Sequence, residues 1–214
     1  MALSLYHLVR EPKIKQDKNP LLLLLHGYGS NEEDLFSFAA QLPDEYFIVS
    51  ARAPYSLPPY GNAWYAITFD NDMNKFSDHK QAAESRDLIA KFIDEVIDAY
   101  PIDKDKVTLV GFSQGTILSY AVALTYPEKV DRVAALSGYI DTEIIGTDYD
   151  KNTMSGLRFF VSHGIVDQVI PVEWARKAPE FLEVLGLDVE YHEYPVGHGV
   201  APQNFYDLLA WINK

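Results

Sequence analysis

Ser113 stands between two glycines where a strand-like stretch gives way to a helix-like one. In the run VTLVGFSQGTILSYAVAL (107–124), residues up to Gly111 are apolar and often β-branched, and helical periodicity begins near Gly115. The pattern G-x-S-x-G at such a junction is typical of a nucleophile elbow, a sharp turn that exposes the serine oxygen. Since a serine-capped helix start gives the same five letters, Ser113 needs partners before we infer a nucleophile.

His198 is the histidine best placed to act as the base that a serine hydroxyl needs. It lies in PVGHG (195–199), after the last predicted strand and before the last predicted helix. That position is the carboxyl end of a strand, as for Ser113, and the flanking glycines allow a close approach. A loop histidine exposed to water is the alternative reading. The sequence gives no such placement to the surface or strand histidines His7, His79 and His192.

Asp167 is the predicted partner of His198. It lies in HGIVDQVIP (163–171), after the apolar stretch RFFVSH, and the next strand in sequence leads to His198. The two loops are therefore expected to be neighbours, and the chain order Ser, Asp, His is that of the α/β-hydrolase triad. A helix-region cap is the other reading of Asp167. The competing acids lie in a polar loop after the strand predicted at 132–137: Asp141, Asp148 and Asp150.

Two backbone amides are predicted to form an oxyanion hole. HGYGS (26–30) directly follows LLLLL (21–25), and its glycines free the backbone to turn its amides toward the strand ends. In the α/β-hydrolase layout, one donor comes from this loop and the other from the residue after the nucleophile. The predicted donors are the N–H groups of Tyr28 and Gln114, whereas His26 is expected to be a structural hydrogen-bonding residue.

Strand and helix patterns alternate along the chain and predict a three-layer α/β domain. The inner strands are apolar without alternation, which is typical of a mostly parallel sheet covered by helices on both faces. Ligands bind such sheets beyond the carboxyl ends of the strands. A proline-rich stretch at 52–76 is expected to form a long loop with a short hairpin over that edge. The seven predicted strands are 3–9, 21–25, 46–51, 106–110, 132–137, 157–163 and 188–194, and the helices are 31–41, 78–99, 114–125, 172–186 and 202–213.

Composition narrows the class of protein. A chain of 214 residues with 48% hydrophobic residues suits one domain, spanning 1–214. It has no cysteine, which excludes disulfides and thiolate zinc sites. The net charge of −13 argues against nucleic acid as a partner. No secretory signal is visible at the N-terminus, and the longest aliphatic run, 21–25, is too short to span a bilayer, so we expect a soluble, cytoplasmic protein without stable membrane insertion.

These motifs together resemble the phospholipase/carboxylesterase family, which includes the acyl-protein thioesterases. The resemblance runs from about residue 20 to the end of the chain, through LLLLLHGYGSNEEDL, GNAWYAI, VTLVGFSQGTILSYAVAL, LSGYI, HGIVDQVIPVEWA and VGHGV. HGYGSNEEDL and GNAWYAI differ from the eukaryotic thioesterases, and the chain looks closer to small bacterial carboxylesterases. The resemblance places the triad on Ser113, Asp167 and His198 and the oxyanion amides on Tyr28 and Gln114. It also implies a compact α/β-hydrolase with a short groove, no large lid, and neither a cofactor nor a metal.

The expected function is hydrolysis of short- to medium-chain carboxylic esters through an acyl-enzyme on Ser113. An acyl-protein thioesterase or lysophospholipase-type hydrolase is the alternative, and a non-catalytic α/β-hydrolase-fold binding protein is the reading from another class. The expected partner is a small-molecule ester, and a homodimer is left open. Candidates to line an acyl pocket, with ordinary packing as the equal alternative, are Trp64, Tyr65, Phe69, Tyr139 and Ile140.

Overall fold

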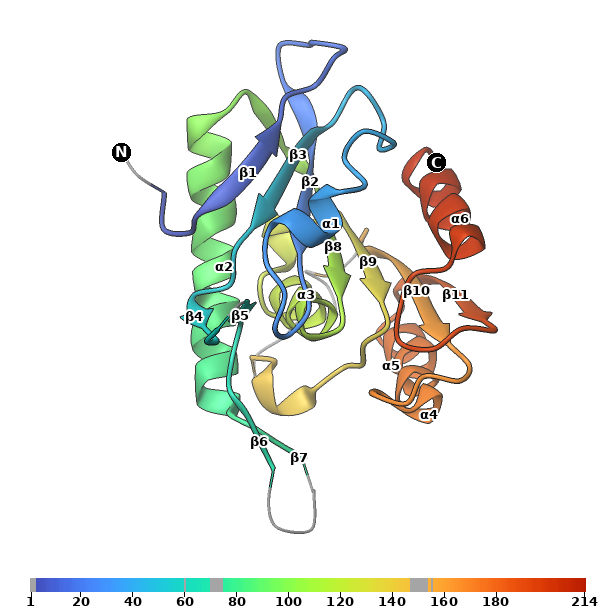
Figure 1. Cartoon of the computed structure of the whole chain (residues 1–214). Coiled ribbons are helices and arrows are strands. Elements are labelled where there is room, and N and C mark those ends of the chain that lie inside the picture. The colour runs from blue at the N-terminus through green and yellow to red at the C-terminus, as the bar shows by residue number, and fades with distance from the viewer. Residues whose placement is uncertain (1–2, 60, 70–74, 147–153, 155) are drawn as a thin grey trace.

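The structure is a computed structural model that describes residues 3–59, 61–69, 75–146, 154 and 156–214. For residues 69, 75 and 76 it describes the backbone alone. Figure 1 shows a central sheet with helices packed on its two faces, the three-layer arrangement predicted from the sequence.

The central sheet has seven strands in the order β1-β3-β2-β8-β9-β10-β11 (Figure 1). Strand β1 pairs antiparallel with β3, and all other neighbours are parallel. Each predicted strand is present, although β1 begins at residue 7 rather than 3 and β8 at residue 102 rather than 106. The bounds are His7–Arg10 (β1), Asn19–Leu25 (β2), Phe47–Ala51 (β3), Ile102–Phe112 (β8), Arg132–Leu136 (β9), Arg158–Gly164 (β10) and Asp188–Tyr194 (β11).

The run of leucines in β2 shows why the inner strands are apolar without alternation. Successive side chains of a strand point to opposite faces of the sheet. Leu21, Leu23 and Leu25 enter a core cluster with α2, α3 and α5, whereas Leu22 and Leu24 enter a second cluster with α1 and α6. Because helices cover both faces, every position of the run is buried. The helices are Glu33–Phe36 (α1), His79–Ala99 (α2), Gln114–Thr125 (α3), Val172–Ala175 (α4), Lys177–Val184 (α5) and Pro202–Ile212 (α6).

Two of the predicted helices differ from the observed ones. The helix predicted at 31–41 is only α1, because beyond it the amides of Phe38 and Ala39 bond three residues back, as in tight turns. The helix predicted at 172–186 is divided into α4 and α5 at Arg176. By contrast α2 keeps its predicted extent, and the Asp78 side chain caps it by accepting from the Gln81 N–H at 3.0 Å.

The stretch at 52–76 was predicted to hold one short hairpin and holds two small antiparallel ladders. Tyr55–Ser56 (β4) pairs with Asn62–Ala63 (β5), and Ile67–Phe69 (β6) pairs with Lys75–Ser77 (β7). Asn62 also bridges to Ser30, so this stretch lies against the loop that follows β2. It therefore covers the carboxyl edge of the sheet, as predicted. Within the described residues, no helix has both the length and the apolar character that crossing a bilayer requires.

Candidate active site

The turn between β8 and α3 forces Ser113 into a backbone conformation that side-chain-bearing residues rarely adopt. Its φ is 54° and its ψ is −115°. The flanking glycines explain why the turn can form. A Cβ on Gly111 would lie 2.5 Å from the Gly115 oxygen, and one on Gly115 would lie 2.0 Å from the Leu25 oxygen. The turn thus requires glycine on both sides of the serine.

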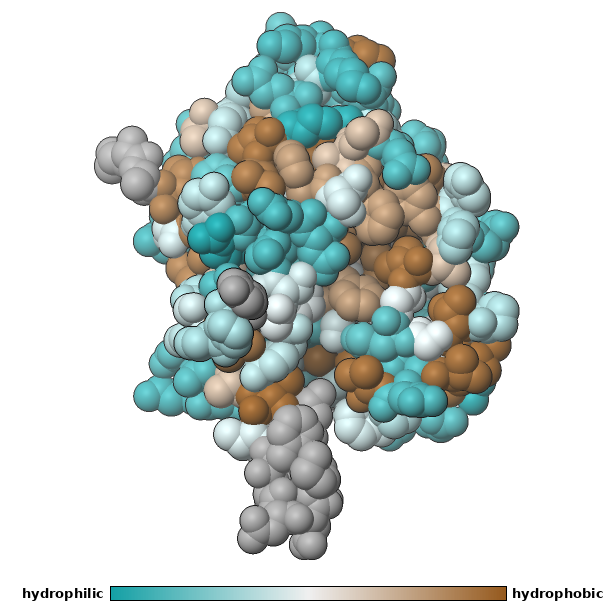
Figure 2. Space-filling model, viewed as in Figure 1, coloured by the Kyte–Doolittle hydropathy of each residue, from teal (hydrophilic) through white to brown (hydrophobic). Residues whose placement is uncertain are grey.

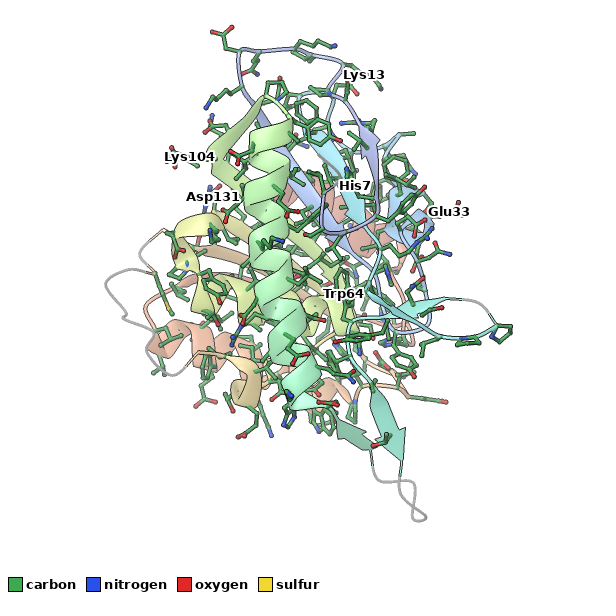
Figure 3. All side chains as sticks on the ribbon, turned by 90° about the vertical axis from the view of Figure 1, so that its left-hand side faces the viewer. His7, Lys13, Glu33, Trp64, Lys104 and Asp131 are labelled. Atoms are coloured by element: carbon green, nitrogen blue, oxygen red, sulfur yellow. The ribbon has the colours of Figure 1, made fainter. Side chains whose placement is uncertain are left out.

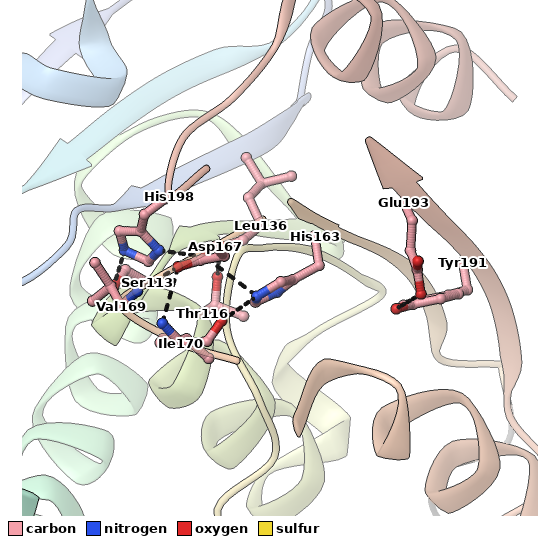
Figure 4. A network of polar contacts seen from close by, with 10 residues as sticks. All are labelled: Ser113, Thr116, Leu136, His163, Asp167, Val169, Ile170, Tyr191, Glu193 and His198. Carbon is pink, nitrogen blue, oxygen red and sulfur yellow. Dashed lines mark hydrogen bonds and ion pairs between the residues drawn. The ribbon is translucent and has the colours of Figure 1, made fainter. Parts of the chain in front are cut away.

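Ser113, His198 and Asp167 form a continuous chain of hydrogen bonds across the strand ends (Figure 4). The Nε2 atom of His198 lies 2.9 Å from the Ser113 Oγ, and its Nδ1 lies 2.7 Å from the Asp167 Oδ2. With Nδ1 protonated toward the carboxylate, Nε2 can accept the serine proton. The structure therefore brings together the three side chains that the sequence singled out, in the geometry that activates a serine hydroxyl.

Gly164 explains how the loops that carry the acid and the histidine come so close. Strands β10 and β11 are parallel neighbours in register up to Gly164 and Tyr194, so both loops leave the sheet at the same height. A Cβ on Gly164 would lie 2.4 Å from the Val196 oxygen and 2.2 Å from the Gly197 oxygen. The backbone of the His198 loop therefore rests directly on the end of β10.

The Asp167 carboxylate is held from the side opposite His198. Its Oδ1 accepts the N–H groups of Val169 at 2.8 Å and Ile170 at 2.9 Å. Burial would by itself raise the pKa of this carboxyl, but the two N–H groups and the His198 ring outweigh it and hold the pKa below its usual value. The carboxylate is consequently ionised at neutral pH and oriented for His198.

His163 is a site residue that the sequence reasoning missed. Its ring is fully buried, donates from Nε2 to the Ile170 oxygen at 2.8 Å, and places that nitrogen 3.3 Å from the Asp167 Oδ2 (Figure 4). It thereby fixes both the loop that carries Asp167 and the carboxylate itself. The signal was its place at the end of the apolar stretch RFFVSH, four residues before Asp167.

The two residues predicted to supply the oxyanion donors lie at one cavity. Gln114 begins α3, so the helix leaves its N–H without an intrahelical acceptor. In the HGYGS loop, Gly29 N–H bonds to the Asn62 oxygen and Ser30 N–H to the Gly27 oxygen, and within the described chain the Tyr28 N–H has no acceptor. Tyr28 and Gln114 line the same cavity as Ser113 and His198.

A cavity of about 550 Å³ opens in front of Ser113. Tyr65, one of the predicted pocket residues, lines it. The sequence did not single out the other side chains of the apolar wall, because they come from separate segments that only the fold brings together. They are Ile67, Ile117, Val169 and Ile170.

The other predicted pocket residues are placed differently. Trp64 was a candidate for the wall, but its side chain is fully buried and does not reach the cavity, because its ring packs inward on His26. Tyr139 and Ile140 line a second cavity of about 500 Å³ with Trp174 and Phe181. The Phe69 side chain lies outside the described part of the structure, as do Asp148 and Asp150.

The second cavity adjoins the first through two tyrosines. Burial raises the pKa of Tyr65 and of Tyr139, the nearby Tyr139 phenol raises the pKa of Tyr65 further, and the Ser77 hydroxyl bonds to both. Asp141, the competing acid that the structure describes, lines this second cavity and lies 3.4 Å from His79 rather than near His198. It is therefore not the acid that contacts the histidine of this site.

A sequence model of the phospholipase/carboxylesterase family matches residues 7–214. The chain belongs to the phospholipase/carboxylesterase family. As a member of this family, whose enzymes act on small-molecule esters, the protein is a hydrolase of the carboxylesterase and acyl-protein thioesterase type. The resemblance read from the motifs is confirmed, and so is the predicted α/β-hydrolase fold.

Named relatives of this phospholipase/carboxylesterase family member include both kinds of hydrolase. Acyl-protein thioesterase 1 of Mycosarcoma maydis is 29% identical over 230 residues, which cover 97% of this chain and 95% of that protein. The Bacillus cereus carboxylesterase structure superposes with a TM-score of 0.85 at 19% identity, covering 98% of this chain and 94% of that one. Acyl-protein thioesterase 2 of Zea mays gives 0.75 at 18%, covering 97% of each chain. At these identities the two structures support the fold alone.

The described residues contain no cluster of side chains suited to hold a metal ion. Nowhere in them do three or more His, Asp or Glu side chains gather as they would around an ion. The charged and polar groups near Ser113 instead bond to one another and to backbone. What the arrangement offers chemically is an activated hydroxyl, a proton acceptor and two free amides beside an apolar cavity.

Proposed function

We propose that this protein is a serine carboxylesterase that hydrolyses short- to medium-chain esters through an acyl-enzyme on Ser113. The observation that carries the proposal is the hydrogen-bond chain from Ser113 through His198 to Asp167 at the wall of an apolar cavity. A buried carboxylate, a histidine and a serine at a strained turn are the parts that nucleophilic acyl transfer needs. Family membership supports the same class of reaction.

In the first half of the reaction, the Ser113 Oγ attacks the carbonyl carbon of the ester while its proton passes to the His198 Nε2. The carbonyl oxygen becomes an oxyanion, which the N–H groups of Tyr28 and Gln114 stabilise. His198 then returns the proton to the alkoxy oxygen as the C–O bond breaks. The alcohol leaves, and the acyl group remains as an ester on Ser113.

In the second half, water replaces the alcohol. His198 takes a proton from the water as its oxygen attacks the acyl carbon, and the same two amides hold the second oxyanion. When this intermediate collapses, the proton on His198 returns to the Ser113 Oγ and the carboxylic acid departs. Asp167 remains ionised throughout and keeps the imidazole in the required orientation.

The cavity supports a limited acyl length. Each CH₂ that the apolar wall buries contributes about 0.8 kcal/mol, or about fourfold in binding, until the wall ends. Ile67, Ile117 and Val169 supply that wall. We expect kcat/KM to rise from acetate to about butyrate or hexanoate and then to fall.

An acyl-protein thioesterase is the second candidate, and one surface feature favours it. Ile165, Val166 and Val169, beside Asp167, expose 45%, 60% and 58% of their surface. Figure 2 shows apolar surface gathered at the lower right of the molecule, over the end of β10. Such a rim could carry the distal part of a long acyl chain. The relative from Mycosarcoma maydis that spans nearly the whole chain bears the thioesterase name.

The deciding experiment is a panel of p-nitrophenyl esters from acetate to palmitate, run beside the matching acyl thioesters, with Ser113→Ala as the control. A maximum at butyrate or hexanoate that Ser113→Ala abolishes supports the short-chain esterase. A profile that climbs to palmitate, with thioesters preferred, contradicts it and favours the second candidate. Turnover that survives in Ser113→Ala would mean that Ser113 is not the nucleophile. Absence of turnover in the unaltered protein, together with failure of a fluorophosphonate probe to label Ser113, would leave a non-catalytic binding protein.

A further inference from the structure

Trp64 does not touch the cavity, yet it is hydrogen-bonded to both sides of the site. Its indole N–H donates to the His26 oxygen at 2.9 Å, and its backbone N–H donates to the Gln114 Oε1 at 2.8 Å. Its backbone oxygen accepts the Ser85 hydroxyl of α2. Figure 3 shows Trp64 inside the molecule beside α2, and its side chain is fully buried.

Two of the three partners of Trp64, His26 and Gln114, lead directly to the candidate oxyanion donors. His26 begins the loop that places the Tyr28 N–H, two residues further along the chain. Gln114 carries the second N–H on its own backbone, and its side chain is fixed at both ends, because its Nε2 also donates to the Tyr65 oxygen at 2.8 Å. A shift of Trp64 would therefore displace the N–H groups of both Tyr28 and Gln114.

The His26 side of this network is itself rigid. Its ring donates from Nδ1 to the Gly27 oxygen at 2.7 Å, and its Nε2 accepts the Ala53 N–H at 3.1 Å. Burial lowers the pKa of His26, so the neutral ring that these two bonds require is the stable form. The loop carrying Tyr28 is thus fixed to the chain at Ala53 and to Trp64, not only to Gly27.

We propose that Trp64 is a positioning residue that sets the spacing of the two oxyanion-hole amides. The inference rests on the function proposed above. In the part of the chain that the structure describes, no other residue hydrogen-bonds to both His26 and Gln114. The ladder between β2 and β8 also joins the two sides of the site, but it ends at Leu25 and Gly111, before either donor. Beyond it the two turns meet by close packing, such as Gly27 against Ser113.

A residue with this role should affect the transition state and not substrate binding. The oxyanion exists only after attack on the carbonyl, so misplaced amides lower kcat and leave KM nearly unchanged. Loss of a whole oxyanion donor lowers kcat by about 10²–10³-fold. Because removal of the indole N–H displaces the donors without deleting them, we expect a fall in kcat of about 10- to 100-fold.

The test uses Trp64→Phe, together with replacement of Trp64 by 3-benzothienylalanine, which keeps the ring shape and puts sulfur in place of N–H. Trp211→Phe is the matched control, since Trp211 is also buried but lies in α6 against Phe160. For each protein, kcat and KM for p-nitrophenyl butyrate are measured with the inhibition constant of 1,1,1-trifluorohexan-2-one. That ketone forms a tetrahedral adduct with the serine and places an oxyanion between the amides.

We expect both Trp64 replacements to lower kcat and to weaken the ketone by a similar factor, with KM within about twofold and Trp211→Phe unchanged. If Trp64→Phe does not fold, the kcat and inhibition constant of the benzothienylalanine protein test the inference on their own. An unchanged kcat in that protein, a rise in KM with normal kcat, or an equal loss in Trp211→Phe overturns the inference. Activity that persists in Ser113→Ala would instead refute the proposed function, so the two failures are distinguishable.

Discussion

Two serines of this protein share a strained backbone but not an environment. Ser113 follows β8 and Ser137 follows β9, the neighbouring parallel strand, and their φ angles are 54° and 53°. Each turn is also bonded to the next strand, because the Ser113 N–H donates to the Leu136 oxygen and the Ser137 N–H to the Ser162 oxygen. Judged by backbone alone, the two turns are nearly equivalent.

The two serines differ in the surroundings of their hydroxyl groups. The Ser113 hydroxyl faces the cavity and bonds to His198, whereas Ser137 is fully buried and its hydroxyl has no partner in the described part of the chain. Ser113 directly precedes the helix α3, with its free amides, while Ser137 leads into a loop. A strained serine is therefore not enough for a nucleophile; the base and the donors must arrive from other strands.

The Ser137 turn nevertheless supports the Ser113 turn. A Cβ on Gly138 would lie 2.5 Å from the Thr116 side chain and 3.1 Å from the Ser113 oxygen. The second turn thus packs against the first turn of α3, directly behind the nucleophile.

The largest effect is expected from removing the two hydroxyl groups in turn. Ser113→Ala should lower kcat by about 10⁶, as loss of the nucleophile does in other serine hydrolases, with little change in melting temperature. Ser137→Ala should keep full activity and equal or higher stability, because a buried hydroxyl without a partner destabilises the folded state. Ester hydrolysis and thermal unfolding of both proteins check this. Comparable activity losses would mean that the turns are not functionally distinct.

The next largest effect is expected at Asp167, the carboxylate that bonds to His198. The Ser137 turn has no such pair of partners. Asp167→Asn should lower kcat by about 10⁴, since an amide favours the wrong imidazole tautomer. Asp141→Asn, at the end of the Ser137 loop, should be near normal, and so should Asp148→Asn and Asp150→Asn. Because the pKa of Asp167 is held below its usual value, wild-type Asp167 stays charged through mild acid. An active Asp167→Asn protein with an inactive Asp141, Asp148 or Asp150 variant would move the acid to the other loop.

The glycines after the two serines should differ in how much stability they control. A Cβ on Gly115 would meet backbone, the Leu25 oxygen at 2.0 Å, whereas one on Gly138 would meet the Thr116 side chain. The Gly115 contact is the closer one and meets a paired strand, so we expect Gly115→Ala to destabilise by about 3 kcal/mol. Gly138→Ala should cost about 2 kcal/mol, because the Thr116 Cβ at 2.5 Å cannot rotate away. Urea unfolding measures both. Equal losses of stability, or a larger loss for Gly138→Ala, would contradict the expectation that the Ser113 turn is the more sensitive of the two.

The smallest effect is expected at a surface ion pair, whose replacement should change stability less than the other variants do. The Arg176 guanidinium bonds to both carboxylate oxygens of Glu193, at 2.7 and 2.8 Å, and lowers the pKa of Glu193 to about 2. Because the pKa of Glu193 is depressed in the folded state, the ion pair stabilises the fold at pH values above the ordinary carboxyl pKa. This contribution is lost as the pH falls through about 2. Since Arg176 is half exposed, the pair contributes less than about 1 kcal/mol.

Replacement Arg176→Gln should therefore lower the free energy of unfolding slightly at pH 7, and the difference should shrink as the pH falls from the ordinary carboxyl pKa toward 2. Melting temperatures of the two proteins across this pH range provide the measurement. A difference that grows as the pH falls would show that the sign is wrong. Ester turnover should be unchanged at pH 7, because neither side chain contacts the Ser113 site.

The sequence predicted the site well where function is tied to the end of a strand. Ser113, Asp167 and His198 each follow an apolar run, and parallel strands bring their carboxyl ends to one edge, so chain order and strand ends were sufficient to place them together. The glycine spacing was informative for the same reason. Their catalytic roles remain a proposal that the variants above test.

What the sequence could not show depends on direction and on distant packing. Trp64 stands in an aromatic cluster beside the edge, but nothing local states that its ring turns inward to His26 instead of outward to the cavity. The Gln114 side chain bonds to Trp64 and Tyr65, about fifty residues earlier, which no local pattern reveals. His163 was hidden by its place within an apolar strand. Helix α1 was predicted too long because its apolar spacing continues through turns.

The position of His198 ties activity to the outer edge of the sheet. It follows β11, the last strand in the sheet order, and it meets a serine 85 residues away in sequence, directly after the central strand β8. Edge strands open locally at lower free energy than central ones. Ester turnover should therefore be lost at a lower denaturant concentration than the one that unfolds the sheet. On refolding, the helical signal should return first and turnover last, when β11 closes on β10.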